Sequence, residues 1–250
     1  MIDVHCHLEQ KDYDKDREEV IKRCIEKMDA VITSCAHPRD FDLTLSLKKK
    51  HPDFIYICIG LHPEYIKELK PMEKEELKEN IKENIQHISA IGEIGLDYYW
   101  TKEEEWRDKQ KDMFRELIDF AKELDKPIVV HSRDAHQDTL DILEEKNAKH
   151  VLLHLWGANQ LVPGIIKNNW NVSFGPILLR SKKHKKICRD MPLEKIMLET
   201  DAPWFGETGT RNEPTSVKNV IARIAEIKGI DSGIVDNLTT ENAKKFFRIG

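Results

Sequence analysis

The sequence lacks the features that place a chain in a membrane or in a disulfide-stabilised secreted scaffold. Its longest apolar run, Phe54–Leu61, has eight residues, whereas a membrane span needs about 20. No basic leader with a small-residue cleavage site is visible at Met1, so we expect an intracellular, cytoplasmic protein. The five cysteines are odd in number and show no CxxC spacing, which indicates buried thiols in a reducing compartment.

An excess of positive charge is also missing. The net charge of −5 excludes a generally basic coat for nucleic acids. It leaves room for a local site that binds phosphate through metal ions and a few cations. No low-complexity linker, internal repeat or break in composition divides the chain, so we predict one domain over residues 1–250.

Short apolar runs alternate with longer amphipathic stretches from one end of the chain to the other. The runs predict eight strands: Met1–His7, Ala30–Ala36, Phe54–Gly60, Ile88–Gly95, Pro127–His131, His150–His154, Asn171–Gly175 and Lys195–Thr200. Helices are predicted at Asp14–Met28, Glu73–Ile85, Glu103–Leu124 and Ala135–Lys146, and the tail Pro214–Phe247 has the pattern of two closing helices.

Strict alternation of strand and helix favours parallel strands joined by right-handed crossovers. Eight such units in 250 residues fit an α/β protein of the (β/α)8 TIM-barrel type. A doubly wound open sheet is the main alternative, but no GxGxxG phosphate loop opens any of the units.

Side chains that bind metals recur where the predicted strands end. His5 and His7 are two residues apart on one strand, so their imidazoles project to the same face. In a (β/α)8 barrel the carboxyl ends of all strands meet at one mouth, where active sites are built. The predicted ligands are His5, His7, Glu93, His131, His154 and Asp201.

Four imidazoles and two carboxylates exceed what one tetrahedral ion needs, and they suit a two-metal site with a bridging carboxylate. Glu93 lies about midway round the barrel and is the expected bridge. Asp201 is expected to hold one ion and to orient, or take a proton from, the hydroxide that the ions generate. Ligands of this type accept Mg²⁺, Mn²⁺ or Zn²⁺.

Seven segments of the chain together resemble the TatD family of metal-dependent deoxyribonucleases. They run in the family's order: Asp3–His7, Gly60–Pro63, Gly92–Asp97, His131–Ala135, Glu199–Pro203, Arg211–Pro214 and Thr239–Phe247. The resemblance implies a TIM barrel of the amidohydrolase type with two divalent cations. It also implies hydrolysis of phosphodiesters, often from the 3′ end of single-stranded DNA. The family's metal ligands fall on the six residues named above.

Two segments depart from the family pattern. The family usually has His-Cys-Phe-Ser-Gly after the sixth strand, whereas this chain has His154-Leu-Trp-Gly-Ala158. The motif after the third strand tends to read His-Pro-His, and here it is His62-Pro-Glu64. The first change alters the pocket wall beside the ligand histidine and so bears on the shape of the substrate. Glu64 either repels a phosphate or faces solvent.

Four side chains near the mouth are expected to contact a phosphate: His62, Arg133, Arg211 and Asn212. Tyr98, Tyr99, Trp100, Trp156 and Trp204 all follow strand ends, where they either stack nucleobases or pack the loops. Arg180 and Lys182–Lys186 form either a solvated helix face or a contact to a nucleic-acid backbone.

These features predict a metal-dependent hydrolase of DNA phosphodiesters, with Asp201 and Glu93 as catalytic residues. We expect a 3′-end exonuclease that acts as a monomer on single-stranded or frayed DNA ends, without a membrane partner. The alternative is an ester or amide hydrolase, or an aminoacyl-tRNA deacylase, on the same barrel, because a fold does not fix a function. A non-catalytic interaction protein is a third hypothesis, and the complete ligand set argues against it.

Overall fold

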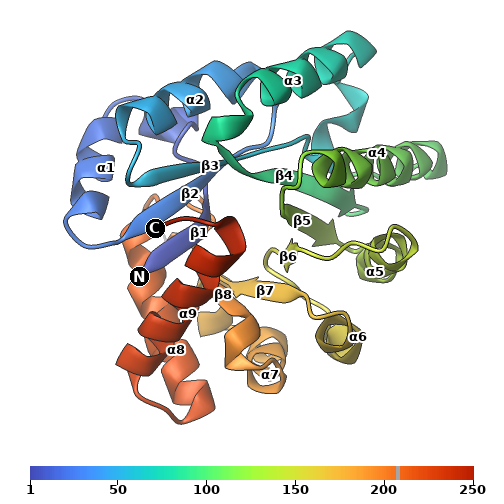
Figure 1. Cartoon of the computed structure of the whole chain (residues 1–250). Coiled ribbons are helices and arrows are strands. Elements are labelled where there is room, and N and C mark those ends of the chain that lie inside the picture. The colour runs from blue at the N-terminus through green and yellow to red at the C-terminus, as the bar shows by residue number, and fades with distance from the viewer. Residues whose placement is uncertain (207–208) are drawn as a thin grey trace.

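Eight parallel strands form one sheet that curls into a nearly closed barrel with helices between the strands, as the alternation predicts (Figure 1). The computed structural model describes residues 1–206 and 209–250. Sheet order follows chain order, and each strand pairs in parallel with the next. The strands are β1 Ile2–Cys6, β2 Ala30–Cys35, β3 Ile55–Ile59, β4 Ile88–Asp97, β5 Ile128–Arg133, β6 Val151–Leu153, β7 Asn171–Phe174 and β8 Ile196–Leu198.

The helices surround the sheet, and the four predicted ones and the two predicted in the tail are present (Figure 1). α4 illustrates why they form: Leu117, Phe120 and Ala121 recur at helical spacing and are buried against the barrel. The helices are α1 Arg17–Ile25, α2 Phe41–Lys50, α3 Pro71–Glu83, α4 Glu104–Glu123, α5 His136–Glu145, α6 Val162–Lys167, α7 Lys182–Asp190, α8 Val217–Lys228 and α9 Ser232–Phe247.

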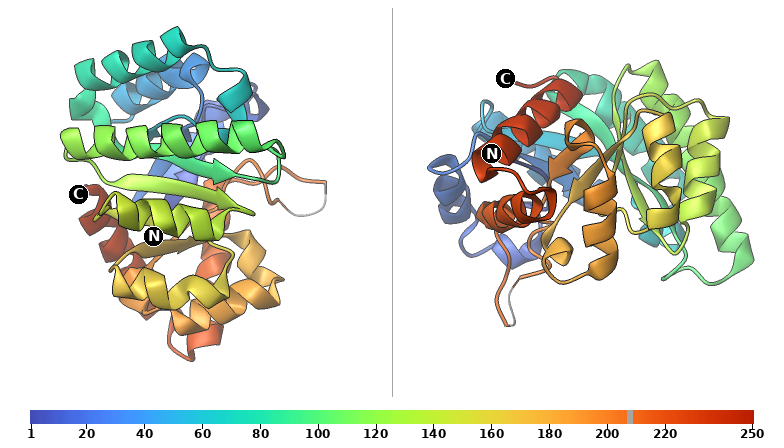
Figure 2. Two further views of the ribbon diagram at one scale, coloured as in Figure 1. Left: turned by 90° about the vertical axis from the view of Figure 1, so that its right-hand side faces the viewer. Right: turned by 90° about the horizontal axis from the view of Figure 1, so that it is seen from below.

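One end of the barrel is covered by α9. Its Ala243 and Phe247 belong to the same buried apolar cluster as Ile2 and Val4 of β1. Both chain termini lie at this end, while the strand arrowheads point to the opposite end (Figure 2). The opposite end is therefore the mouth of the barrel, and it is the only end where loops that follow strands can build a site.

The seam between β1 and β8 is closed at the mouth by short polar contacts. The Asp3 carboxylate accepts hydrogen bonds from the Thr200 amide at 3.1 Å and from the Thr200 hydroxyl at 2.5 Å. Just beyond, the Asp201 amide donates to the His5 carbonyl at 2.9 Å. These contacts fix the first predicted ligand strand beside the last.

Irregular register turns the ligands of β1 and β4 into the mouth. The β1–β2 pairing shifts between Asp3 and Cys6, and the β4–β5 pairing shifts between Ile91 and Ile94. Such bulges commonly re-aim a side chain next to an active site. Val4 packs in the barrel interior, and the next residue, His5, nevertheless also faces inward.

β4 and β5 are longer than their apolar runs indicate. Glu93 and His131 were expected at strand ends, but both lie inside strands, because pairing continues from Gly95 opposite His131 to Asp97 opposite Arg133. The cause is that the polar residues beyond the apolar runs still pair through their backbone. Arg133 is consequently the last residue of β5 and not part of a loop.

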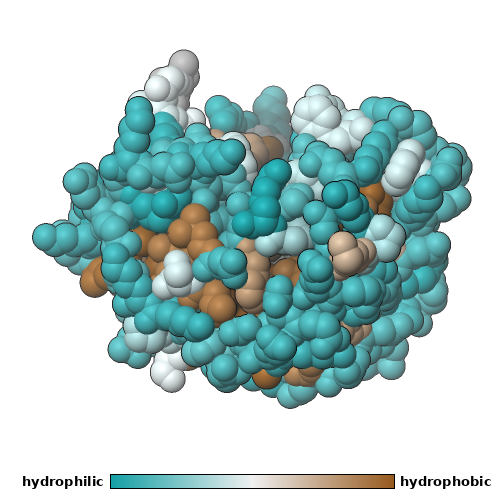
Figure 3. Space-filling view, turned by 90° about the horizontal axis from the view of Figure 1, so that it is seen from above, coloured by the Kyte–Doolittle hydropathy of each residue, from teal (hydrophilic) through white to brown (hydrophobic). Residues whose placement is uncertain are grey.

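The exterior is mainly polar. The side seen from above is mostly hydrophilic, with one main group of hydrophobic residues and a few others scattered across it (Figure 3). Among the residues that the structure describes, no helix combines the length and the apolar character that crossing a membrane requires. Four exposed aromatic side chains follow β4 and β8 at the mouth: Tyr99, Trp100, Trp204 and Phe205.

Candidate metal centre

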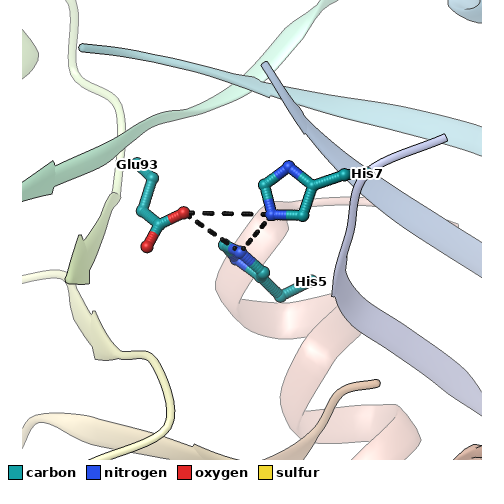
Figure 4. Close-up of side chains that lie close together, drawn as sticks. All are labelled: His5, His7 and Glu93. Carbon is teal, nitrogen blue, oxygen red and sulfur yellow. Dashed lines mark hydrogen bonds and ion pairs between the residues drawn. The ribbon is translucent and has the colours of Figure 1, made fainter. Parts of the chain in front are cut away.

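The structure brings the six predicted ligands together at the mouth. His5 Nε2 lies 3.1 Å from His7 Nε2 and 3.2 Å from Glu93 Oε2 (Figure 4). Asp201 Oδ1 approaches the same pair, at 3.4 Å from His7 Nε2 and 3.6 Å from His5 Nε2. Residues from β1, β4 and the segment after β8 therefore converge on one point.

Glu93 divides the centre into two halves. Its Oε2 faces His5 and His7, at 3.2 and 4.0 Å from their Nε2 atoms. Its other oxygen, Oε1, faces His131 Nδ1 at 2.8 Å and His154 Nε2 at 3.5 Å. One carboxylate thus presents a separate oxygen to each pair of histidines.

The donor set fits divalent metal ions. Two ligand atoms bound to one ion at about 2.1 Å, at an angle of about 90–110°, lie about 3.0–3.4 Å apart. The His5–His7 and His7–Asp201 distances of 3.1 and 3.4 Å fall in that range, and the His5–Asp201 distance of 3.6 Å lies just above it. Imidazole nitrogens and carboxylate oxygens are ligands that Zn²⁺ and Mn²⁺ accept. Among the described residues, three groups bring their ligand atoms within 4.8 Å of one another, close enough to hold a cation: His5, His7 and Glu93; His5, His154 and Glu199; and His62, Glu93 and His131.

Buried partners hold the imidazoles in place. His154 Nδ1 lies 2.8 Å from Glu199 Oε2, and His7 Nδ1 lies 3.2 Å from Glu9 Oε1. Each acid contacts Nδ1 of the ring and so turns Nε2 into the centre. Acids that contact the nitrogen not used for metal binding commonly orient metal-binding histidines in this way. Sequence reasoning missed both acids, although each is two residues from a predicted ligand.

Asp97 is a further residue that the sequence did not single out. Its Oδ2 lies 2.9 Å from His131 Nε2, while Nδ1 of the same ring faces Glu93. Burial alone would raise the pKa of Asp97, but its hydrogen bond to His131 lowers that pKa. The sequence feature that could have identified Asp97 is its position four residues after Glu93, on the same face of β4.

Electrostatics at the centre favour positive charge. Burial alone would raise the pKa of Glu93, but the neighbouring histidines, His154 first, hold that pKa well below its ordinary value. Burial would lower the pKa of His154, but Glu199 and Glu93 raise it to about 10. The carboxylates therefore stay ionised and stabilise a cationic charge between them.

A cavity of about 490 Å³ opens above the centre. Two of the four expected phosphate contacts, His62 and Arg133, line this cavity, and the other two do not. The lining residues are His7, Gln10, Ala36, His62, Glu64, Tyr65, Glu93, Asp97, Trp100, His131, Arg133, His154, Asp201, Trp204 and Phe205.

Comparison with known proteins agrees with this geometry. A family model described as TatD related DNase matches residues 2–248. The chain belongs to the TatD family.

Relatives of this TatD protein extend over almost its whole length. An uncharacterised metal-dependent hydrolase of Bacillus subtilis, YabD, is 37% identical and is matched over 100% of this chain and 99% of its own. The deoxyribonuclease TATDN3 of Homo sapiens is 31% identical over 99% of this chain and 94% of its own. The crystal structure of YJJV, a TatD homologue from Escherichia coli K12, superposes with a TM-score of 0.92 at 23% identity, covering 100% and 98% of the two chains.

These findings establish the barrel and the class of activity. The TatD protein is a metal-dependent hydrolase, and its fold is that of the TatD homologue. The resemblance drawn from the seven sequence segments is thereby confirmed.

His62 is placed as a hydrogen-bond donor at the cavity of the TatD centre. Its Nδ1 accepts a hydrogen bond from the Glu64 amide at 3.2 Å, so the neutral ring carries its proton on Nε2. Nε2 faces Glu93 Oε1 at 3.6 Å. Burial, and then the charge of His131, lowers the pKa of His62 to about 3, which keeps the ring neutral.

The structure does not bring Arg211 to the cavity. Its guanidinium forms a bidentate pair with Asp16, with two N–O distances of 2.7 Å, and lies over the Tyr13 ring at 4.4 Å. Asn212 is buried, and its Nδ2 donates to the Thr200 carbonyl at 3.1 Å. In place of the expected phosphate contacts, both residues fasten the loop after β8 to the barrel, because each finds a partner inside the protein.

The aromatic residues divide between the cavity and the packing of the loops. Trp100 and Trp204 are half-exposed and line the cavity. The Arg133 guanidinium lies 3.7 Å from the centre of the Tyr99 ring. Trp156 is fully buried, and its indole N–H donates to the Ala158 carbonyl at 2.9 Å, so it packs the loop after β6.

Proposed function

We propose that this TatD enzyme hydrolyses phosphodiester bonds of DNA and removes nucleotides from the 3′ end of single strands. The observation that carries the proposal is the position of Glu93, with one oxygen toward His5 and His7 and the other toward His131 and His154. That arrangement suits two divalent cations bridged by one carboxylate.

The two halves of the centre would each hold one cation. His5, His7, Asp201 and Glu93 Oε2 belong to the first half, and His131, His154 and Glu93 Oε1 to the second. When bound, such cations acidify water and neutralise charge that develops at phosphorus.

The chain's own residues then bind the ester and handle the proton. His62 Nε2–H and the Arg133 guanidinium line the cavity and donate hydrogen bonds to non-bridging phosphate oxygens. Burial alone would raise the pKa of Asp201, but its hydrogen bond to His7 lowers that pKa, so the carboxyl stays ionised. The carboxylate therefore orients the attacking water and receives its proton.

DNA is supported as the substrate by two lines of argument. Some relatives, including human TATDN3, are named deoxyribonucleases. In addition, Trp100 and Trp204 present aromatic surfaces in the cavity on which unpaired bases can stack. A single-stranded end offers both an unstacked base and an accessible phosphate.

A second candidate, hydrolysis of a carboxylic ester, is favoured by Glu64. Its carboxylate lines the cavity at the position where the family pattern has histidine. A negative group there opposes a phosphate and is compatible with a neutral ester. Burial, and then Asp97, raises the pKa of Glu64.

The test is cleavage of a 5′-labelled single-stranded oligonucleotide with Mg²⁺ or Mn²⁺, with and without a chelator. Glu93→Ala and Asp201→Ala are compared with Glu226→Gln, which removes an exposed carboxylate that pairs with Arg223 on α8. We expect a ladder that shortens from the 3′ end, abolished by the chelator and by the first two variants only.

Absence of cleavage by the metal-loaded wild type would refute the proposal. Turnover of carboxylic esters or aminoacyl-tRNA under the same conditions would then establish the second candidate.

A further inference from the structure

Charge is distributed very unevenly along this acidic chain. The 44 residues from Lys146 to Arg189 contain nine lysines and arginines and no aspartate or glutamate. All 45 acidic residues therefore lie in the other parts of a protein whose net charge is −5. The acid-free segment comprises β6, α6, β7 and α7 up to Arg189, which form one continuous sector of the barrel wall (Figure 1).

The densest positive charge of this sector lies at the mouth. Arg180 precedes α7, and Lys182 and Lys183 form its first turn, just after the strand β7 has ended. All three side chains are exposed. Within the described part of the chain no ion pair is formed by any of the three, whereas Lys74 and Lys78 share the Glu116 carboxylate elsewhere on the surface. We call Arg180, Lys182 and Lys183 the cationic rim.

The cationic rim adjoins the loop that follows a predicted metal ligand. The loop that starts at His154 reaches Gly157 three residues later. A methyl group placed on Gly157 would lie 3.4 Å from Lys183 Nζ and 3.3 Å from His136 Nε2. The Lys183 ammonium therefore lies beside the loop that follows His154, three residues along the chain from that predicted ligand.

We propose that the cationic rim binds the phosphates of single-stranded DNA that precede the bond to be cleaved. The inference rests on the proposed function, because it extends the same site along its substrate. A polyanion approaching a molecule of net charge −5 meets cations without neighbouring acids of the same segment along this sector. Several unpaired cations in sequence match the repeated charges of a polynucleotide better than the single charge of a small ester.

The rim also has a consequence for direction. If the scissile phosphate lies at Glu93 and the preceding phosphates lie over Gly157 and Lys183, the strand leaves the centre toward α7. The free 3′ end then points into the rest of the cavity, whose lining includes Arg133 and Trp100. Removal of nucleotides from the 3′ end requires the strand to run in this direction.

The test compares two double variants that remove equal charge from the same sector. Arg180→Gln/Lys183→Gln neutralises the rim. Lys149→Gln/Arg189→Gln neutralises two exposed cations near the opposite end, just before β6 and at the end of α7. Binding of a 5′-fluorescein-labelled 20-nucleotide oligo-dT is measured by fluorescence anisotropy at several salt concentrations, with a chelator present so that no cleavage occurs. Thermal unfolding verifies that both variants fold.

We expect the rim variant to bind the 20-mer about tenfold more weakly, and the control variant to bind like the wild type. The slope of log K against log salt should fall by about 1.4 in the rim variant, because each lost single-strand phosphate contact removes about 0.7. Equal affinities and slopes for the two variants would overturn the proposal.

The outcomes separate the two proposals. If the wild type never cleaves DNA, the proposed function is refuted. If the rim variant nevertheless loses affinity for the oligonucleotide, the rim stands as a DNA-binding surface. The wild type is also tested on anionic phospholipid vesicles. If it binds them more tightly than the oligonucleotide, and the rim variant loses that binding, the rim belongs to a membrane surface and the inference is overturned.

Discussion

The carboxylate of Asp3 and the hydroxyl of Thr200 are 2.5 Å apart, and this contact joins the first strand to the segment that follows the last. Asp3 also accepts a hydrogen bond from the His5 amide at 3.1 Å. The same buried carboxylate therefore fixes the backbone beside the ligands His5 and Asp201. Closing the barrel and assembling the metal centre are consequently one structural event.

Replacing Asp3 by alanine is expected to lower the free energy of unfolding by about 2–4 kcal/mol, because the buried Thr200 and His5 donors lose their acceptor. Asp3→Asn keeps one acceptor oxygen and should cost less. Urea unfolding in the presence of a chelator measures both variants without a contribution from bound metal. Equal stability of wild type and Asp3→Ala would contradict the role given to the seam.

Glu93→Gln is expected to reduce bound metal from two ions per chain to at most one, because the amide cannot offer an anionic oxygen to both halves. Cleavage should fall at least about 100-fold. Metal content after dialysis, measured by plasma emission spectroscopy, gives the stoichiometry. Glu226→Gln serves as the control, since its carboxylate contacts only Arg223 in the described ion pairs. Retention of two ions by Glu93→Gln would rule out the bridging role.

Arg211→Gln is expected to lower stability by about 1 kcal/mol and to leave DNA affinity unchanged, since its guanidinium pairs with Asp16 outside the cavity. Asp16→Asn should have a similar effect, and the double variant should cost little more than either single one. Chemical unfolding and oligonucleotide binding of the four proteins form the measurement. A loss of DNA affinity in Arg211→Gln alone would instead return this arginine to substrate binding.

These same residues show how much of the fold and of the candidate site can be predicted from the sequence. The strands, and the convergence of the six candidate ligands near their ends, were predictable, because hydrophobic periodicity and chain order are read from the sequence and place strand ends at one mouth. Arg211 was not, because its partner Asp16 is 195 residues away and belongs to a different loop. The pattern at Arg211–Pro214 indicates the family, but it does not show which acid forms an ion pair with the Arg211 guanidinium.

The extended ends of β4 and β5 were missed for a different reason. Their last residues are polar, and hydrophobic periodicity cannot detect a strand held by backbone pairing alone. Asp97 was overlooked as a result, although its place on β4 sets it beside His131. The partners of ligands are harder to predict than the ligands, since they depend on which way each imidazole ring is turned.

His136 makes a contribution to stability that depends on pH. Its burial, and then the charge of Lys183, lowers its pKa to about 4, while an unfolded histidine has a pKa of about 6.5. Between these values the unfolded chain binds a proton that the folded chain does not. Stability therefore falls as the pH is lowered from about 6.5 to about 4.

His136→Gln should remove this part of the acid sensitivity. We expect the loss of stability between pH 7 and pH 4.5 to be about 1–2 kcal/mol smaller in the variant than in the wild type, after allowance for partial solvent screening. Urea unfolding at a series of pH values, with a chelator, gives the two slopes. The histidines of the metal centre contribute to both proteins alike, so the difference isolates His136. His150→Gln, which removes an exposed imidazole, is the control. If stability depends on pH equally in His136→Gln and the wild type, the prediction is wrong. The His136 ring, which packs on Trp156, would then bind a proton as readily in the folded chain as in the unfolded one.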